Sequence, residues 1–282
     1  MSFLAIKVVK ADGTTEEFQP QKIMRTLQRA GASKAAAEKV ISEIEAILYD
    51  GITTKEILKR VKVLLPKEEI EVAMRYDLKG AIMRMGPAGF PFETFVSEVL
   101  QHYGYKTKLR TLVQGKCVQH EIDIIAERTS GAAKRCMIEC KFHNLPGASV
   151  DLKDVLYTYA RFLDLNEGND LGKCDRFDEV WLASNTSASS DATRYANCKE
   201  MKLLCWRYPK EMGLEKMVEG KRLYPATILR SVDKETLDKL SEANLMLAKD
   251  LVTHNMNSLK EKTGLKEGKL RKLVSDARRL LF

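Results

Sequence analysis

Two short segments set the expected architecture of this chain: Ile122-Asp123-Ile124-Ile125 and Met137-Ile138-Glu139-Cys140-Lys141. Each segment is rich in β-branched and apolar residues, which predicts two strands. The polar residues 127–135 between them include Gly131 and suit the turn of a hairpin. Because side chains alternate along a strand, Glu139 and Lys141 share a face, and Asp123 of the partner strand can meet them there in the right register.

Two carboxylates and one ammonium group in this arrangement can bind a divalent metal and polarise a water molecule beside it. The pattern D-x(15)-E-x-K is short, however, and a charged pair on the edge of a solvated hairpin has the same composition. The segments on either side of the pattern therefore decide between a metal site and a surface hairpin.

The flanking segments extend the hairpin to an α/β domain. Apolar residues at helical spacing alternate with short apolar runs that are typical of strands. The expected elements are a helix over 92–102, strands entering at Tyr105 and covering 122–125 and 137–141, a helix over 152–163, a strand over 179–183, a helix over 190–201 and a strand over 203–206. Their order is αβββαβαβ.

This order, with these acids, resembles the PD-(D/E)xK restriction-endonuclease fold and, within it, the Mrr-like branch. The resemblance implies a nuclease domain over residues 89–209 that hydrolyses phosphodiester bonds. The residues that carry it are Phe92-Glu93, Leu100, Gly104-Tyr105, Asp123, Glu139-Cys140-Lys141, Ser184-Asn185-Thr186, Ala192, Tyr195-Ala196 and Leu203-Leu204.

The resemblance also assigns roles to the charged residues. Asp123 and Glu139, helped by the backbone carbonyl of Cys140, would hold Mg²⁺ or Mn²⁺, which prefer hard oxygen ligands. Lys141 would orient or deprotonate the attacking water and support the charge that builds on the phosphate. Glu93 would reach the metal from the preceding helix, directly or through water. The alternative for Glu93 is an ordinary acid at a helix N-terminus.

Further polar residues lie close to the pattern in sequence. Lys153 and Tyr157 are one turn apart on the following helix and share a face. Many Mrr-like proteins carry glutamine and tyrosine there, so Lys153 replaces the glutamine and would contact the scissile phosphate, unless it is a surface lysine. Glu121 shares the face of Asp123 and would be a reserve metal ligand, unless it is a solvated partner of Lys116 or Lys141. His120 and His143 flank the site, and we assign neither of them a catalytic role.

Residues 1–88 are expected to form a separate domain that begins with a hairpin. A strand over residues 3–9 is followed by the strong turn signal Asp12-Gly13. Pro66 is expected in a loop, and Gly86-Pro87 ends the last helix. The expected helices cover 20–30, 34–48, 55–64 and 67–85, the second capped by Ser33 and the third by Thr53 or Thr54.

This first segment resembles the ATP-cone module of ribonucleotide reductases. The resemblance is carried by Val8-Val9-Lys10-Ala11-Asp12-Gly13, Glu16, Lys22-Ile23, Ala30-Gly31, Tyr49-Asp50-Gly51-Ile52, Thr54 and Val72-Ala73-x-x-Tyr76. It implies that ATP or dATP binds as a regulator without chemistry, and the contacts would fall on Val9, Lys10, Lys22, Ile23 and Thr54. Two lysines and a threonine hydroxyl suit a phosphate, although solvated surface lysines are the alternative.

The last segment, residues 210–282, is expected to be helical and basic. Leu259, Thr263-Gly264-Leu265 and Leu270 resemble half of a helix-hairpin-helix unit, which would present a helix N-terminus and backbone amides to a nucleic-acid phosphate. A helical dimerisation or docking domain with a solvated basic face is the alternative. The cations of this segment are Lys262, Lys266, Lys269, Arg271, Lys272, Arg278 and Arg279.

Composition sets the outer limits. The chain has 282 residues, 44% of them hydrophobic and 30% charged, which favours a soluble protein of one to three domains. No apolar run approaches the roughly 18 residues of a membrane span, and Met1 to Lys10 lack a signal-peptide pattern, so we expect a cytoplasmic protein. The six cysteines form no C-x-x-C pair, which argues against a zinc ribbon. The net charge of +8 suits a nucleic-acid partner.

The sequence therefore predicts an α/β multi-domain protein: a helical ATP-cone with a small β-sheet (1–88), a restriction-endonuclease-like core (89–209) and a basic helical domain (210–282). The predicted function is a Mg²⁺-dependent endonuclease acting on DNA, with an adenine nucleotide as regulator and a homodimer as one possible assembly. The alternatives are a non-catalytic nucleic-acid-binding repair or regulatory protein and an RNA-processing nuclease, because phosphate contacts do not report the sugar.

Overall fold

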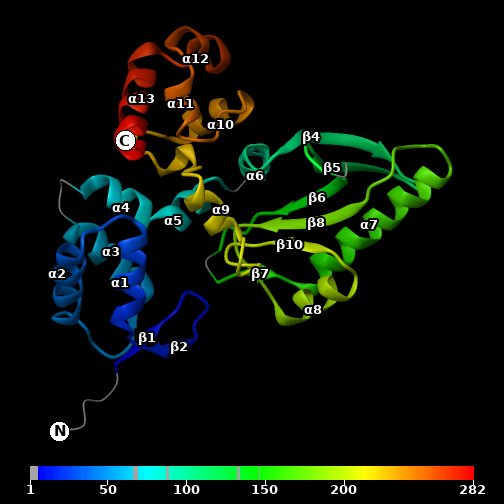
Figure 1. Ribbon diagram of the computed structural model, residues 1–282. Helices are drawn as coiled ribbons and strands as arrows, with labels where there is room; N and C mark the ends of the chain where they lie inside the picture. Colours follow the sequence, from blue (N-terminus) through cyan, green and yellow to red (C-terminus); the bar gives the residue numbers. More distant parts are fainter. Residues whose placement is uncertain (1–5, 66–68, 87–88, 132–133, 146) are drawn as a thin grey trace. The chain divides into compact units, whose positions relative to one another are not determined.

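The structure is a computed structural model that describes residues 6–65, 69–86, 89–131, 134–145 and 147–282 (Figure 1). The chain forms two compact units. The first comprises residues 1–78, 145–147 and 282, and the second comprises residues 79–144 and 148–281. Several expected features lie outside the described residues: the strand residues 3–5, the loop at Pro66, the start of the expected fourth helix at 67–68 and the helix stop at Pro87.

The first unit contains a small sheet in the order β2-β1-β3, formed by β1 (Lys7–Val9), β2 (Thr15–Glu17) and β3 (Ile52–Thr53). Strands β1 and β2 are antiparallel, and β1 and β3 are parallel. In the turn, Asp12 Oδ1 accepts a hydrogen bond of 2.9 Å from the Thr14 amide. Gly13 has φ 81°, a conformation that favours glycine. The predicted Asp12-Gly13 hairpin is thus confirmed.

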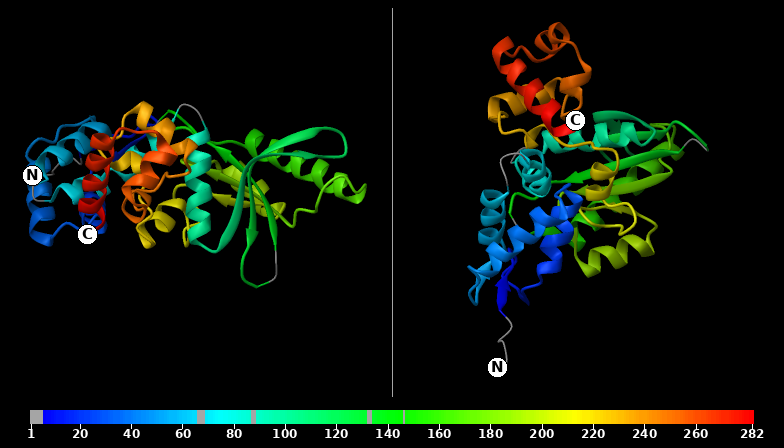
Figure 2. Two further views of the ribbon diagram at one scale, coloured as in Figure 1. Left: turned by 90° about the horizontal axis from the view of Figure 1, so that it is seen from above. Right: turned by 60° about the vertical axis from the view of Figure 1, so that its left-hand side comes forward.

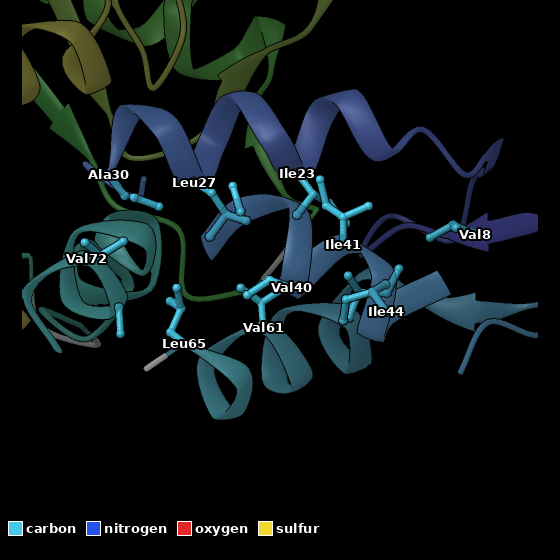
Figure 3. Close-up of a cluster of buried hydrophobic side chains, with 14 of the residues drawn as sticks. Val8, Ile23, Leu27, Ala30, Val40, Ile41, Ile44, Val61, Leu65 and Val72 are labelled. Carbon is cyan, nitrogen blue, oxygen red and sulfur yellow. The ribbon is translucent and has the colours of Figure 1, made fainter. Parts of the chain in front are cut away.

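Helices pack around this sheet as the periodicity predicts. They are α1 (Pro20–Arg29), α2 (Lys34–Glu45), α3 (Thr54–Leu64) and α4 (Ile70–Tyr76). Ser33 caps α2, and Thr53, not Thr54, caps α3 through a capping box with Glu56. The apolar faces meet in one core, which includes Leu27, Ile44 and Val61 (Figure 3).

The prediction of one long fourth helix over 67–85 is wrong. The described residues form two helices, α4 and then α5 (Leu78–Met83), and Asp77 between them has a non-helical conformation. Asp77 also pairs with Lys62, with 2.7 Å between Nζ and Oδ2. Aspartate is a poor residue for a helix interior because its side chain competes for hydrogen bonds with the backbone. The spacing of the apolar residues continues across Asp77, so it does not predict the break between the two helices.

The second unit is built on a five-stranded sheet in the order β10-β8-β6-β5-β4. Strands β4, β5 and β6 are antiparallel neighbours, and β6, β8 and β10 are parallel. Figure 2 shows the β4–β5 and β5–β6 hairpins (green) pointing in different directions in its left view. The strands are β4 (Tyr105–Gln114), β5 (Gln119–Arg128), β6 (Arg135–Lys141), β8 (Glu179–Ser184) and β10 (Lys202–Leu204).

Three helices complete the order αβββαβαβ, which confirms the prediction. They are α6 (Phe90–His102), α7 (Leu152–Asp170) and α8 (Ser190–Cys198). Val155 and Leu165 of α7 and Ala192 of α8 share one core with Met137 and Leu182 of the sheet. Helix α6 contacts β4 and β5. A small pair of parallel strands, β7 (Ser149–Val150) and β9 (Ser187–Ala188), was not predicted because two residues carry no periodicity.

Helix α7 is longer than the predicted 152–163. Its last residues are polar, but they have tertiary partners. Asp164 accepts hydrogen bonds from the amide of Cys117 (2.8 Å), and its Oδ2 lies 2.8 Å from Nε2 of His120. Asn166 exchanges hydrogen bonds of 3.0 Å with the backbone of Phe177. These contacts extend the helix, and they cannot be predicted from local sequence.

The remainder of the second unit is helical, as predicted. In α12, Leu259 and Thr263 are buried, and Gly264 with φ 62° turns the chain into α13. None of the helices in the described parts of the chain is long and apolar enough to cross a membrane. The elements are α9 (Leu214–Gly220), the 3-10 helix η2 (Ala226–Ile228), α10 (Lys234–Glu242), α11 (Asp250–Thr253), α12 (Met256–Thr263) and α13 (Glu267–Leu281).

Candidate active site

The register of β5 and β6 brings the acidic residues of the pattern together. Ile124 pairs with Ile138, so Asp123 stands beside Glu139 at the next position along the antiparallel pair. Asp123 Oδ2 accepts a hydrogen bond of 2.7 Å from the Cys140 amide. Lys141 Nζ lies 2.7 Å from Glu139 Oε1. The structure thus places Asp123, Glu139 and Lys141 in one cluster, as the strand alternation predicts.

Burial perturbs the ionisation of this cluster. Glu139 is 4% exposed and Glu93, on α6, is 8% exposed. Burial, reinforced by the charge of Glu139, raises the pKa of Asp123 to about 7. Burial also raises the pKa of Glu93, although a hydrogen bond from Arg110 opposes this shift. Carboxyl groups that raise one another's pKa form a site where a cation is favourable.

Arg161 on α7 also contacts the cluster, although it was not predicted as a site residue. Its Nη1 donates to Glu139 Oε2, and its Nη2 donates to the backbone oxygen of Glu121. Its side chain is 9% exposed. Its Nε is buried and has no hydrogen-bond partner among the residues that the structure describes. Arg161 follows Tyr157 by four residues, so the helical spacing that links Lys153 to Tyr157 could have extended to it.

Arg110 on β4 is a second residue that the sequence analysis missed. Its Nη1 lies 3.2 Å from Glu93 Oε2. It falls between the pairs Leu109–Ile124 and Thr111–Ile122, opposite Asp123, and has φ 46°. A non-glycine residue in this left-handed region is strained, and such strain gathers at functional sites. No local sequence signal marks this position.

Other predicted residues have clear positions. Tyr157 is 58% exposed, and its ring centroid lies 5.6 Å from Lys141 Nζ and 5.4 Å from Arg161 Cζ. Lys153 is exposed, and among the described residues it makes no hydrogen bond or ion pair with the acidic cluster. The structure therefore brings Tyr157 to the cluster but leaves Lys153 on the solvent side of α7.

The segment after Lys141 is fixed by residues of the expected Mrr-like tail. Ser184 Oγ donates to the Lys141 carbonyl at 2.7 Å. Asn185 accepts from the His143 amide and donates to the His143 carbonyl, both at 2.9 Å. His143 Nδ1 lies 3.0 Å from Thr186 Oγ1. His143 and His120 are thus each held by side-chain contacts, with Thr186 and with Asp164.

The carboxylates of the cluster are candidate ligands for a divalent metal ion. Within the described chain, no group of three or more His, Cys, Asp or Glu side chains is arranged to hold a metal ion. Both oxygens of Glu139 have cationic partners, Lys141 and Arg161. The donor chemistry nevertheless fits: Asp123 and Glu139 are hard oxygen ligands on adjacent strands.

Two of the predicted nucleotide residues, Lys10 and Lys22, pair with one carboxylate of the first unit. Glu16 Oε2 lies 2.9 Å from Lys10 Nζ and 2.7 Å from Lys22 Nζ. Val9 pairs with Thr53, which brings Lys10 near Thr54 at the start of α3, while the Ile23 side chain is buried. Glu16 therefore pairs with both lysines and balances one of their two charges.

The basic C-terminal segment is partly paired. Lys269 Nζ lies 2.6 Å from Asp233 Oδ2, and Arg271 Nη2 lies 2.6 Å from Glu267 Oε1. Lys266 and Lys272 are exposed. Part of the positive charge of this segment is therefore balanced by neighbouring acids, and part is exposed.

A cavity of about 430 Å³ also lies in the second unit, lined mainly by aromatic and apolar side chains that include Tyr105, Trp181 and Met217. None of the predicted site residues lines it. The acidic cluster is therefore the better candidate for chemistry.

The sheet order and the acidic cluster together define a class: this is a restriction-endonuclease-like protein with additional domains. Comparison with family models agrees. Residues 6–78 match the ATP cone domain, residues 84–207 match a restriction endonuclease model of the Mrr type, and residues 224–281 match the model described as AF1548-like, C-terminal. The predicted ATP-cone and Mrr-like resemblances are thus confirmed.

Individual relatives narrow the assignment. An uncharacterized protein of Archaeoglobus fulgidus is 41% identical over 186 residues, which are 66% of this chain and 99% of the relative. A second protein of that organism is 55% identical over 40 residues, which are 14% of this chain and 85% of that protein. The crystal structure of the protein of unknown function AF1548 has 40% identity and a TM-score of 0.60 over 68% of this chain and 98% of its own. This chain belongs to the AF1548-like family.

Proposed function

We propose that this protein is a Mg²⁺- or Mn²⁺-dependent endonuclease that hydrolyses phosphodiester bonds of DNA. The observation that supports this function best is the cluster of Asp123 on β5 with Glu139 and Lys141 on the neighbouring strand β6. It lies within the segment that matches the restriction endonuclease model. The domain boundaries that accompany this proposal are near residues 88 and 209.

Asp123 and Glu139, with the carbonyl of Cys140, would hold the metal, which supplies Lewis-acid activation of a water molecule and of the phosphate. Burial alone would lower the pKa of Lys141, but the hydrogen bond and charge of Glu139 outweigh burial and raise it. Lys141 would orient or deprotonate the attacking water and stabilise the negative charge that builds on the phosphate.

The remaining predicted residues surround this centre. Glu93, held by Arg110, would reach the metal directly or through water. Lys153 and Tyr157 would face the incoming strand from the solvent side of α7, where Lys153 would contact the scissile phosphate. The exposed lysines of the C-terminal segment would hold neighbouring phosphates.

We further propose that the first unit binds ATP or dATP as a regulator and does not hydrolyse it. The contacts would come from Lys10, Lys22 and Thr54 and from the backbone of Val9 and Ile23. Because Lys10 and Lys22 both pair with Glu16, a nucleotide phosphate would take the place of this carboxylate.

A cleavage survey tests the proposed function and its alternatives. The full chain is incubated with Mg²⁺ or Mn²⁺ and with duplex DNA, single-stranded DNA, branched DNA or RNA of one sequence. We expect cleavage of DNA by the wild type and by Lys106→Ala, which removes an exposed lysine of β4, but not by Lys141→Ala. Cleavage of RNA alone would support the RNA-processing alternative. Tight binding without cleavage of any substrate would support the non-catalytic alternative.

A further inference from the structure

Arg161 binds a carboxylate oxygen of Glu139 that a metal ion would use as a ligand. Its guanidinium and the Lys141 ammonium take the two carboxylate oxygens of Glu139. The side chains of Glu139 and Arg161 are 5% and 9% exposed, so water does not screen this pair effectively. A cation approaching Glu139 therefore competes with an internal cation.

The charges around Glu139 would change when a metal binds. In the structure this carboxylate lies between two cations, Lys141 and Arg161. A divalent ion would add two positive charges beside them, and like charges repel one another strongly in a buried site. Transfer of Arg161 from Glu139 to a phosphate, which carries a negative charge, would relieve this repulsion.

Arg161 could also bind a phosphate from where it lies. Its Nε is buried without a hydrogen-bond partner among the described residues, so part of its hydrogen-bonding capacity is unused where it lies. Its guanidinium and the Lys141 ammonium lie near the same ring, that of the exposed Tyr157. A phosphate that approaches over Tyr157 would meet both cations, and guanidinium groups bind phosphate in a bidentate way.

We propose that Arg161 is an internal counterion that keeps the metal off Glu139 until a nucleic-acid phosphate offers Arg161 another partner. Metal and substrate would then load together, and the protein without nucleic acid would bind metal weakly. This inference rests on the proposed function, because it assumes that Glu139 holds the metal.

The test measures Mn²⁺ affinity of the full chain by calorimetry, with and without a duplex whose phosphorothioate linkages resist cleavage. Without duplex, we expect Arg161→Met to bind Mn²⁺ at least tenfold more tightly than the wild type. With duplex, the wild-type affinity should rise toward that of the variant, whose own affinity should change little. Arg161→Gln, which keeps a donor without the charge, should behave like Arg161→Met and serves if the latter does not fold.

A matched control removes an arginine from another buried glutamate. Arg207 binds Glu215 through Nε and Nη2 at 2.8 and 2.9 Å, and Arg207→Met should leave Mn²⁺ affinity unchanged. Equal or weaker Mn²⁺ binding by both Arg161 variants, with measurable binding by the wild type, would overturn the inference alone. Absence of Mn²⁺ binding in the wild type and both variants, with and without duplex, would overturn the metal site and the inference with it.

Discussion

The two units each place one glutamate between two cations, in opposite surroundings. In the first unit Glu16 lies between Lys10 and Lys22, and the three side chains are 27%, 40% and 54% exposed. In the second unit Glu139 lies between Lys141 and Arg161, and Glu139 is 5% exposed. Exposed ion pairs add little to stability, whereas removing one partner from a buried pair is costly.

This difference indicates how each arrangement can be used. A solvated phosphate can replace Glu16 at the two lysines with little loss, which suits a reversible nucleotide site. At Glu139 a new ion must displace the buried cation Arg161, which suits a site that forms only when Arg161 has another partner.

The largest expected effect is on cleavage. Asp123→Ala and Glu139→Ala should each lower the cleavage rate by about 1,000-fold or more, because the metal contributes several kcal/mol to the transition state. Glu127→Ala is the control, since this acid lies on β5 with a side chain that is 56% exposed. Undiminished cleavage by both variants, with unchanged melting, would show that the buried glutamate is not a metal ligand.

The next effect is on stability. Arg161→Met should lower the free energy of unfolding by about 3 kcal/mol, because it removes one partner of a buried pair. Lys22→Met should leave it unchanged within error, because the pair with Glu16 is solvated. Urea denaturation of the full chain measures both, and equal losses in the two variants would remove the contrast between the units.

Glu98 is a buried carboxyl group that, unlike Glu16 and Glu139, has no cationic partner in the part of the chain that the structure describes. Both oxygens of Glu98 accept from the Met246 amide, at 2.9 and 3.0 Å. Burial, with the nearby charge of Asp250, raises the pKa of Glu98 to about 9 from the ordinary 4.5. The folded state therefore holds a proton that the unfolded chain releases.

It follows that the stability from Glu98 is fully present below about pH 4.5 and is lost as the pH rises toward 9. We expect the free energy of unfolding to fall by up to about 1.4 kcal/mol per pH unit in this window. Glu98→Gln should flatten the fall, and Glu261→Gln, at an exposed position, should not. Identical pH profiles for wild type and Glu98→Gln would show that Glu98 is ionised in the fold.

Nucleotide affinity should respond to the exposed arrangement in two directions. Lys22→Ala should weaken ATP binding by roughly tenfold, the value of one charge-assisted hydrogen bond. Glu16→Gln should strengthen it, because the lysines lose their internal partner. Calorimetry on the full chain measures both, with Lys34→Ala at an exposed lysine as control. No binding of ATP or dATP at millimolar concentration would contradict the assignment of a nucleotide site.

How much the sequence revealed depended on how local the information was. Asp123, Glu139 and Lys141 were found because strand alternation has a period of two and the hairpin is short. Arg161 and Arg110 were missed because their positions depend on the packing of α7 and on the distorted backbone of β4. The break at Asp77 and the end of α7 were missed for the same reason: polar residues there are fixed by distant partners.

The central claim is that the Asp123–Glu139–Lys141 cluster cuts DNA with a bound divalent metal. The most direct measurement follows covalently closed circular DNA, which has no ends and so reports endonuclease activity alone, in EDTA and after addition of excess Mn²⁺. We expect intact circles in EDTA, nicked and linear DNA after Mn²⁺ is added to the wild type, and intact circles with Lys141→Ala under both conditions. Cleavage by the wild type in EDTA, or equal cleavage by Lys141→Ala in Mn²⁺, would contradict the claim.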